Sequence, residues 1–280
     1  MQIADPSTAQ RVTDEHREGE LDNRTLLKGR QGSPGNYKLN VSHAVTEWKT
    51  PRHTHVFDQI RFPLEGEFVY GKDKVLKAGQ VAYFPAGVYY GPQIRRAGLK
   101  LVLAQFGTTT GGGFLSYEER KAAMDALQHK GKFENGVFTY IDAHGQRHNQ
   151  DASEAVWEQA TGGKPHYPEP RYGEVIIMNP SSFGWVAEGD GLLHKWLGTF
   201  TEGGARVGFI RLERGATYRA GLHYAPELLF VVSGTVDCAG RKYPAHTAFG
   251  LEASEGPIAL TGTQASELYC VQLPMLPMTN

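Results

Sequence analysis

Cysteine is scarce in this chain: among 280 residues only Cys238 and Cys270 are cysteines. Neither belongs to a C-x-x-C pair, which argues against the usual zinc and thiol redox motifs. Two cysteines are also too few for a disulfide framework. A single disulfide between them stays open, but we expect two buried free thiols in a reducing compartment.

Long apolar runs and an excess of charge of one sign are also missing. No run of about 18 apolar residues could span a bilayer, and residues 1–20 lack the apolar centre of a signal peptide. The 29 basic and 30 acidic residues leave a net charge of −1, which gives no electrostatic case for nucleic acid or a membrane surface as partner. We therefore expect a cytoplasmic protein with a small-molecule substrate.

Instead, apolar and polar residues alternate along much of the chain, which is typical of β-strands. Segments with a period of two run from about residue 37 to residue 106, and they return from about residue 172. Short strands separated by turn signals favour a β-sandwich or β-barrel. Forty per cent hydrophobic residues supply enough apolar material for a real core.

Helical signals are confined to the region between these two parts. A Thr/Gly linker at 108–113 is followed by a predicted helix at 116–129, which opens with a capping-box pattern from Ser116 to Glu119. A small hairpin is expected at 133–147, and a second short helix at 151–159.

The residues that indicate a site are concentrated between positions 50 and 91. His53 and His55 are two apart, so in an extended segment their imidazoles point to the same side. Gln59 and Arg61 share a face in the same way, and a bend in the three residues before Gln59 would bring that face round to the histidines. This predicts a polar site inside a sheet rather than a core.

The same stretch resembles the two sequence motifs of the cupin superfamily. The first motif, G-x5-H-x-H-x3,4-E-x6-G, is matched in spacing by His53, His55, Gln59 and Gly66. The second, G-x5-P-x-G-x2-H-x3-N, is matched by Gly79, Pro85, Gly87 and Tyr90. Three features depart from the pattern: Gln59 replaces the usual Glu, Tyr90 replaces the usual His, and the glycine that opens the first motif is absent.

A second copy of the first motif occurs in the carboxyl-terminal half. His223, Glu227 and Gly234 repeat the spacing of His55, Gln59 and Gly66. Matching gaps on similar strand–turn sequences indicate duplication. Gly221 takes the position of the first histidine, so we interpret His223 and Glu227 as the remnant of a site. The barrel that carries them is expected to be chiefly structural, or to form the floor of the site or a dimer surface.

The resemblance and the repeat together imply a mainly β bicupin protein, with two tandem jelly-roll β-barrel domains joined by a short helical insert. The expected parts are an N-terminal arm, an N-terminal cupin domain with the candidate active site, a helical linker and a C-terminal cupin domain with a degenerate site, at residues 1–35, 36–110, 111–170 and 171–280. A homodimer is expected because cupins commonly dimerise.

In cupins a divalent metal ion is typically bound by three histidines and a glutamate. The resemblance carries this role to His53, His55, Gln59 and Tyr90, with iron as the first choice and Mn, Ni, Zn or Cu as alternatives. An ionised Tyr90 would restore the negative charge that Gln59 removes. Ionising a phenol at neutral pH costs about 4 kcal/mol, which a bound cation can offset.

Such a site with open coordination positions admits O2 and a chelating substrate. The resemblance therefore implies a metal-dependent dioxygenase, an oxidoreductase acting on a small oxygenated or aromatic compound. Tyr90 and Arg61 are the candidate catalytic residues. Arg61 suits a substrate carboxylate or enolate, although an arginine paired with a neighbour at the rim is an equal interpretation. Tyr83 and Gln105 are further candidate substrate-binding residues.

Two alternatives need no metal. Some cupins are isomerases, epimerases or related lyases that use a histidine base and a tyrosine acid, and here Tyr90, Tyr83 or Tyr70 would be the acid. The chain could also bind a small molecule without catalysis. The missing Glu and the missing third His favour the metal-free isomerase.

Overall fold

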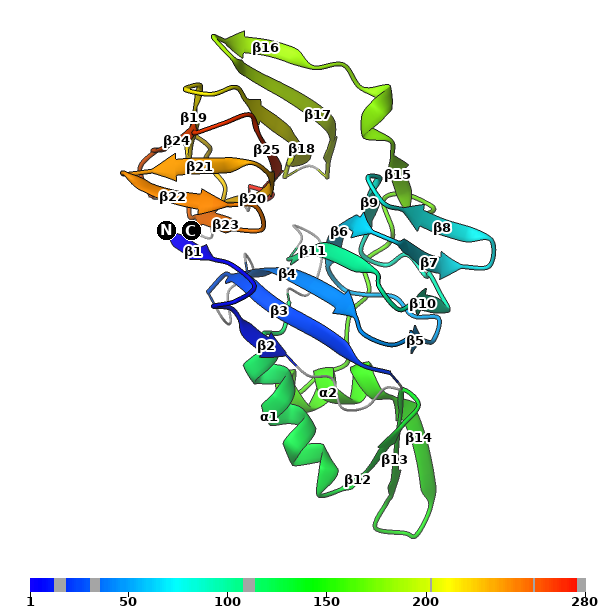
Figure 1. Cartoon of the computed structure of the whole chain (residues 1–280). Helices are drawn as coiled ribbons and strands as arrows, with labels where there is room; N and C mark the ends of the chain where they lie inside the picture. The colour runs from blue at the N-terminus through cyan, green and yellow to red at the C-terminus, as the bar shows by residue number, and fades with distance from the viewer. Residues whose placement is uncertain (13–18, 31–35, 108–113, 202, 254, 276–280) are drawn as a thin grey trace.

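The computed structural model of the chain describes residues 1–12, 19–30, 36–107, 114–201, 203–253 and 255–275. Two β-barrels lie side by side, and a small unit with two helices lies against the N-terminal barrel (Figure 1). This confirms the predicted fold class. The linker predicted at 108–113 lies outside the described residues. Neither helix within the described ranges is long and apolar enough to cross a membrane.

The N-terminal barrel consists of a large and a small antiparallel sheet. The large sheet has the order β15-β9-β6-β11-β4-β3-β2, formed by β2 (Gln10–Val12), β3 (Leu21–Lys28), β4 (Tyr37–Ala44), β6 (Asp58–Glu65), β9 (Val81–Phe84), β11 (Lys100–Phe106) and β15 (Ile176–Met178). The small sheet has the order β5-β10-β7-β8, formed by β5 (Trp48–Thr50), β7 (Glu67–Gly71), β8 (Lys74–Lys77) and β10 (Gln93–Arg95).

The C-terminal barrel repeats this plan. Its large sheet has the order β1-β23-β20-β25-β18-β17-β16, formed by β1 (Gln2–Ala4), β16 (Val186–Gly189), β17 (Leu192–Phe200), β18 (Ala205–Leu212), β20 (Glu227–Ser233), β23 (Ala248–Leu251) and β25 (Ser266–Gln272). Its small sheet has the order β19-β24-β21-β22, formed by β19 (Thr217–Ala220), β21 (Thr235–Cys238), β22 (Arg241–Pro244) and β24 (Ile258–Gly262).

The two barrels exchange strands at their edges. β1 pairs with β23 of the C-terminal barrel, and β15 pairs with β9 of the N-terminal barrel. The segment 1–35, expected to be an N-terminal arm, supplies β1, β2 and β3. The first two are short edge strands, and β3, which pairs with β2 and β4, is only partly buried over most of its length, so none of them shows a clear apolar alternation in the sequence. The strand pairing thus crosses the expected boundaries at residues 35 and 170.

The insert between the barrels has two helices and a three-stranded sheet. Helix α1 (Tyr117–Gln128) is capped by Ser116 and Glu119, which form the predicted capping box. Helix α2 (Ala152–Thr161) is capped by the Asp151 side chain. The sheet consists of β12 (Gly131–Glu134), β13 (Val137–Ile141) and β14 (Arg147–Asp151), one strand more than the predicted hairpin.

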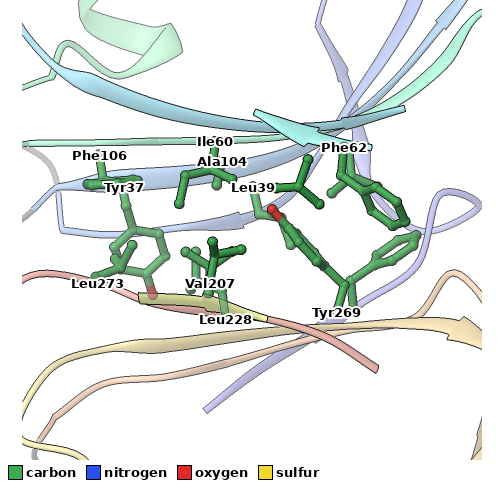
Figure 2. Close-up of a cluster of buried hydrophobic side chains, with 14 of the residues drawn as sticks. Tyr37, Leu39, Ile60, Phe62, Ala104, Phe106, Val207, Leu228, Tyr269 and Leu273 are labelled. Carbon is green, nitrogen blue, oxygen red and sulfur yellow. The ribbon is translucent and has the colours of Figure 1, made fainter. Parts of the chain in front are cut away.

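The large sheets of the two barrels pack face to face, and their contact forms the largest apolar core (Figure 2). The labelled side chains of the N-terminal sheet are Tyr37, Leu39, Ile60, Phe62, Ala104 and Phe106. They face Val207, Leu228 and Tyr269 of the C-terminal sheet and Leu273, which follows β25. Aromatic contacts cross the interface, with the Phe62 and Tyr269 ring centroids 5.0 Å apart. The barrels are therefore joined by a continuous core rather than by a linker alone.

Strand β6 is buried on both faces as a consequence. Ile60 and Phe62 point into the core between the barrels, so the residues that alternate with them, Gln59 and Arg61, point into the N-terminal barrel. The interior of the C-terminal barrel is filled with aliphatic side chains such as Leu229, Val231 and Leu251. The N-terminal barrel instead places the polar side chains Gln59 and Arg61 of β6 and Gln105 of β11 inside.

Packing between the sheets predicts that truncating a buried leucine there lowers the stability strongly. Leu228 lies in the shared core and is 1% exposed, whereas Leu222 of the same barrel is 62% exposed. We expect Leu228→Ala to lower the free energy of unfolding by about 2–5 kcal/mol through the cavity that it leaves. Leu222→Ala should change it by less than about 0.5 kcal/mol. Denaturant unfolding measures both, and equal effects would contradict the proposed core.

Candidate functional site

Backbone hydrogen bonds hold the two motif segments together. The amide of His53 donates to the carbonyl of Tyr90 over 3.0 Å, and the amide of Tyr90 donates back over 3.1 Å. The amide of Gly87 donates to the carbonyl of His55 over 2.9 Å. Residues some 35 positions apart in the chain are thereby placed in register, as the shared motif spacing requires.

Gly87 is required where these segments meet the insert. Its φ of +80° is a conformation that favours glycine, and a Cβ on it would lie 2.2 Å from the carbonyl oxygen of Pro168. A bend at residues 56–57 follows the histidines. This is where the bend was predicted, and it turns β6 so that Gln59 faces the same interior as His53 and His55.

A hydrogen-bond network inside the barrel is centred on Gln59 and Arg61. The Gln59 amide donates to the Tyr90 hydroxyl oxygen over 2.6 Å. One Arg61 nitrogen donates to Gln59 Oε1 over 2.8 Å and to the Tyr90 oxygen over 3.4 Å. Gln105 also donates to Gln59 Oε1, over 3.0 Å, and a second Arg61 nitrogen donates to Gln93 over 3.4 Å.

Arg61 is a buried cation held by neutral groups. It is 2% exposed, and its guanidinium lies over the rings of Phe84 and Phe68, 4.3 and 4.7 Å from their centroids. Burial lowers the pKa of Arg61, but a guanidinium keeps its charge at neutral pH. Among the described residues, it donates hydrogen bonds to two amides and a phenol, none of them a carboxylate.

The Tyr90 phenol is neutral in this environment. Complete burial raises the pKa of Tyr90, and the nearby charge of Arg61 only partly opposes that rise. The phenol oxygen accepts hydrogen bonds from Gln59 and Arg61. Tyr90 therefore orients the network and does not carry a negative charge into it.

The hydrogen bonds of His53 indicate one neutral tautomer. Its Nδ1 lies 2.7 Å from the carbonyl oxygen of Pro51, so it carries the proton and donates. Its Nε2 lies 3.3 Å from the Gln93 amide nitrogen, which donates to it. Nε2 thus keeps a lone pair. His55 is a close neighbour, with its ring centroid 4.9 Å from that of His53, and it stacks on Phe57 at 4.5 Å.

A cavity of about 130 Å³ opens beside this network, between the barrel strands and the insert helices. Among the described residues, no Asp or Glu lines it. Its ionisable lining consists of two histidines and four cationic residues: His53, His55, Lys38, Arg61, Arg95 and Arg120. Amides and hydroxyls supply much of the rest: Asn23, Asn40, Gln93, Gln105, Thr50 and Ser153. The cavity is therefore polar and positively charged.

The structure brings most of the predicted site residues together. His53, His55, Arg61 and Gln105 line the cavity, and Gln59 and Tyr90 lie behind them in the network. Tyr83 is not part of this group.

Tyr83 alternates with Ala82 and Phe84 on β9, so it faces the core between the barrels, where its ring stacks on Phe200 at 4.3 Å. The expectation that Tyr83 binds substrate took no account of this parity.

Sequence reasoning missed several cationic residues of the cavity. Lys38 and Asn40 alternate with apolar residues on β4, so the alternation of that strand was a usable signal. Arg95 lies on β10, where it donates to Ser42 over 2.9 Å. Arg120 is on α1, and no local pattern in the sequence indicates that this helix reaches the barrel.

The remnant in the C-terminal barrel is a closed structural network. Glu227, fully buried, accepts hydrogen bonds from the Tyr218 hydroxyl over 2.6 Å, the Gly221 amide over 2.7 Å and the Gln272 amide over 3.2 Å. His223 also contacts Gln272. The carboxylate is satisfied by protein groups in a barrel filled with aliphatic side chains, which supports the structural interpretation of this half.

Comparisons with known proteins bear on the fold. No protein-family model matches the sequence, and neither does any curated protein. Solved structures do match. A candidate dioxygenase from Nostoc punctiforme has a TM-score of 0.61 at 13% identity, covering 99% of this chain and 84% of its own. The chain has the cupin fold.

Two further matches to this cupin fold span nearly the whole chain. One is to a candidate glyoxylate-induced protein from Pseudomonas aeruginosa, with a TM-score of 0.58 at 11% identity, covering 99% of this chain and 90% of its own. The other is to oxalate decarboxylase from Bacillus subtilis, with a TM-score of 0.54 at 12% identity, covering 99% and 78%. At these identities the likeness establishes the fold alone.

The cupin site does not fit a divalent metal ion in the arrangement described. The Gln59 and Tyr90 oxygens, two of the predicted ligand atoms, accept hydrogen bonds from Arg61. A divalent ion about 4 Å from this guanidinium would be repelled by roughly 8 kcal/mol at an effective dielectric of about 20. Among the described residues, no three His, Cys, Asp or Glu side chains gather to hold a metal. The metal set stays a prediction that this donor geometry does not favour.

The Asp58 side chain adds a further hydrogen bond between the two motif segments. Its Oδ1 accepts the Ala86 amide over 2.8 Å. Burial raises the pKa of Asp58 from 3.8 to about 6, because desolvation outweighs the opposing effects of Ala86, Tyr83 and Arg171. Ionised Asp58 is therefore disfavoured in the folded state relative to the unfolded chain.

This raised pKa predicts a pH-dependent stability. The contribution of Asp58 is fully present below pH 3.8 and is lost as the pH rises through about 6, by up to roughly 3 kcal/mol at about 1.36 kcal/mol for each pH unit. We expect Asp58→Asn, which keeps the acceptor for Ala86, to be more stable than the wild type at pH 7 and to lack this loss.

Denaturant unfolding between pH 4 and pH 8 measures the effect. Asp190→Asn, the same change at an exposed position, is the control and should follow the wild-type profile. If Asp58→Asn also follows the wild-type profile, Asp58 does not titrate in this way.

Proposed function

We propose that the N-terminal barrel binds a small organic anion, such as a carboxylate or an enolate, and acts on it by acid–base chemistry without a metal. The observation that carries this proposal is the buried guanidinium of Arg61, with neutral hydrogen-bond partners, in a cavity lined by cations. A buried charge without a counterion is costly. A bound anion would supply that counterion.

Gln59 is central to this proposal. Its oxygen lies 2.8 Å from Arg61, so a glutamate there would form a salt bridge and neutralise the guanidinium. The amide orients Arg61 and leaves its charge available to a ligand. The replacement of the usual Glu by Gln then has a direct consequence, a shift of preference from a cation to an anion.

His53 is the proposed base. Its Nδ1 is engaged with Pro51, and its Nε2 lies at the cavity, where it accepts a hydrogen bond from Gln93 that has to break before Nε2 takes up a proton. In the step that we propose, Nε2 takes a proton from the carbon next to the carboxylate or carbonyl group. The electron pair moves to the oxygen, where Arg61 stabilises the enolate, and the proton returns to another face or another carbon. The reaction class is an isomerisation or epimerisation, and loss of a leaving group from the same enolate would make it a lyase.

Two other candidates remain. A metal-dependent dioxygenase was the first prediction from the sequence, and one structural neighbour is named as a candidate dioxygenase. It would require Arg61 to leave the Gln59 and Tyr90 oxygens. A barrel that binds the anion without catalysis would keep every contact described here. The experiments below separate the three.

Anion binding is expected to depend on Arg95 and Gln59. Arg95→Gln should weaken the binding of small carboxylates at least about tenfold, because it removes one charged donor from the cavity. Gln59→Glu should weaken it similarly by pairing with Arg61. Ligand-observed NMR titration at constant ionic strength measures the dissociation constants.

Arg96→Gln is the matched control, since Arg96 follows Arg95 in the chain but is exposed and does not line the cavity. It should bind carboxylates like the wild type. If all three variants bind equally, the cavity is not the anion site.

Catalysis without a metal predicts exchange of substrate hydrogen in the presence of a chelator. In D2O with EDTA, we expect the wild type to exchange a C–H proton of one or more members of a panel of small 2-oxo and 3-oxo carboxylates, followed by NMR. His53→Gln should slow the exchange by about 100-fold or more. His144→Gln, at an exposed turn, should not.

The other outcomes of this experiment are informative. Binding without exchange, with or without metal, identifies a non-catalytic binding protein. Turnover that needs an added metal and O2, together with stoichiometric metal by elemental analysis, would overturn the metal-free proposal in favour of the dioxygenase.

A further inference from the structure

We infer that the anion carries an aryl or other bulky apolar group and that the helical insert binds this group. The inference rests on the proposed function, because it takes the cavity of the N-terminal barrel as the anion site. It goes further by naming the second part of the substrate and the part of the protein that selects it.

A second, apolar pocket adjoins the anion cavity. It has a volume of about 50 Å³ and is lined mainly by apolar and aromatic side chains. The aromatic members are Phe57, Phe114, Trp157 and Tyr167, which pack together in a small cluster separate from the barrel cores. At this volume the pocket takes the edge of an aromatic ring or a branched alkyl group, and the rest of such a group would lie at the opening shared with the anion cavity.

The two pockets meet at three shared residues. His55, Arg120 and Ser153 line both of them. The His55 ring lies 4.9 Å from His53 on the side of the anion cavity, and it stacks on Phe57 at 4.5 Å on the side of the apolar pocket. A ligand with its anionic end at the cations and its apolar end among the aromatic rings would cross at His55. Its reacting carbon would then lie beside the imidazoles.

The insert supplies much of the apolar pocket. Arg120 comes from α1, and Ser153, Val156 and Trp157 come from α2. The barrel strands supply most of the cationic lining, so the two recognition elements come from different parts of the chain. The insert is therefore placed to decide which anions are accepted, while the barrel provides the charge and the base.

The inference predicts an affinity difference between two simple probes, acetate and phenylacetate. The wild type should bind phenylacetate at least about tenfold more tightly, because the ring enters the apolar pocket. Trp157→Ala should reduce this ratio toward one and leave the affinity for acetate unchanged. Trp157→Phe, which keeps an aromatic ring, should retain most of the ratio. NMR titration at constant ionic strength measures both probes.

A second variant keeps the test valid even if Trp157→Ala does not fold. Leu115→Trp adds bulk to the apolar pocket instead of deleting it, and it should also abolish the preference for phenylacetate. A ratio near one in the wild type, or an unchanged ratio in both variants, would overturn the inference while anion binding itself survives. If neither probe binds, or if Arg95→Gln leaves the affinity for both probes unchanged, the proposed anion site itself is contradicted.

Discussion

The contact between the Arg61 guanidinium and the Gln59 oxygen is the constraint on which the site depends. A cation in the interior of a barrel is tolerated only with aligned acceptors and aromatic faces around it, and Gln59, Gln93, Tyr90 and Phe84 provide these. Because these partners are neutral, the positive charge persists in the cavity. The anionic ligand proposed for the cavity rests on that charge.

The position of Arg61 follows in turn from the packing of the two barrels. Strand β6 is buried on both faces, with Ile60 and Phe62 in the shared core, so its alternate residues have to point inward. The apolar contact between the large sheets holds this strand in register (Figure 2). A slip of one residue would exchange the core face for the site face. The interface between the barrels is thus also the support of the site.

The two barrels differ in the residue at one corresponding position, which is Glu227 in the C-terminal barrel and Gln59 in the N-terminal barrel. Glu227 in the C-terminal barrel is a carboxylate satisfied by Tyr218, Gly221 and Gln272, with Leu229 two residues later in an aliphatic interior. The N-terminal barrel has an amide and an arginine at the corresponding positions. One barrel has become a filled scaffold, and the other has kept an open polar interior.

Patterns in the sequence were enough to predict the fold class and the central residues of the site. The motif spacing and the repeat identified two β-barrels, and strand parity placed His53 with His55 and Gln59 with Arg61, because these are local regularities of an extended chain. The capping box of Ser116 located α1 for the same reason.

How these residues are combined could not be predicted from local patterns. Strand β1 in the opposite barrel, Tyr83 in the shared core, and Arg95 and Arg120 at the cavity all result from contacts between distant segments. The hydrogen-bond partners of Arg61 decide whether the interior suits a cation or an anion, and they come from β6, from β10 and from the loop that carries Tyr90. A local sequence pattern does not predict which distant segments come together, because the burial and charge balance of a residue depend on its neighbours in the folded protein.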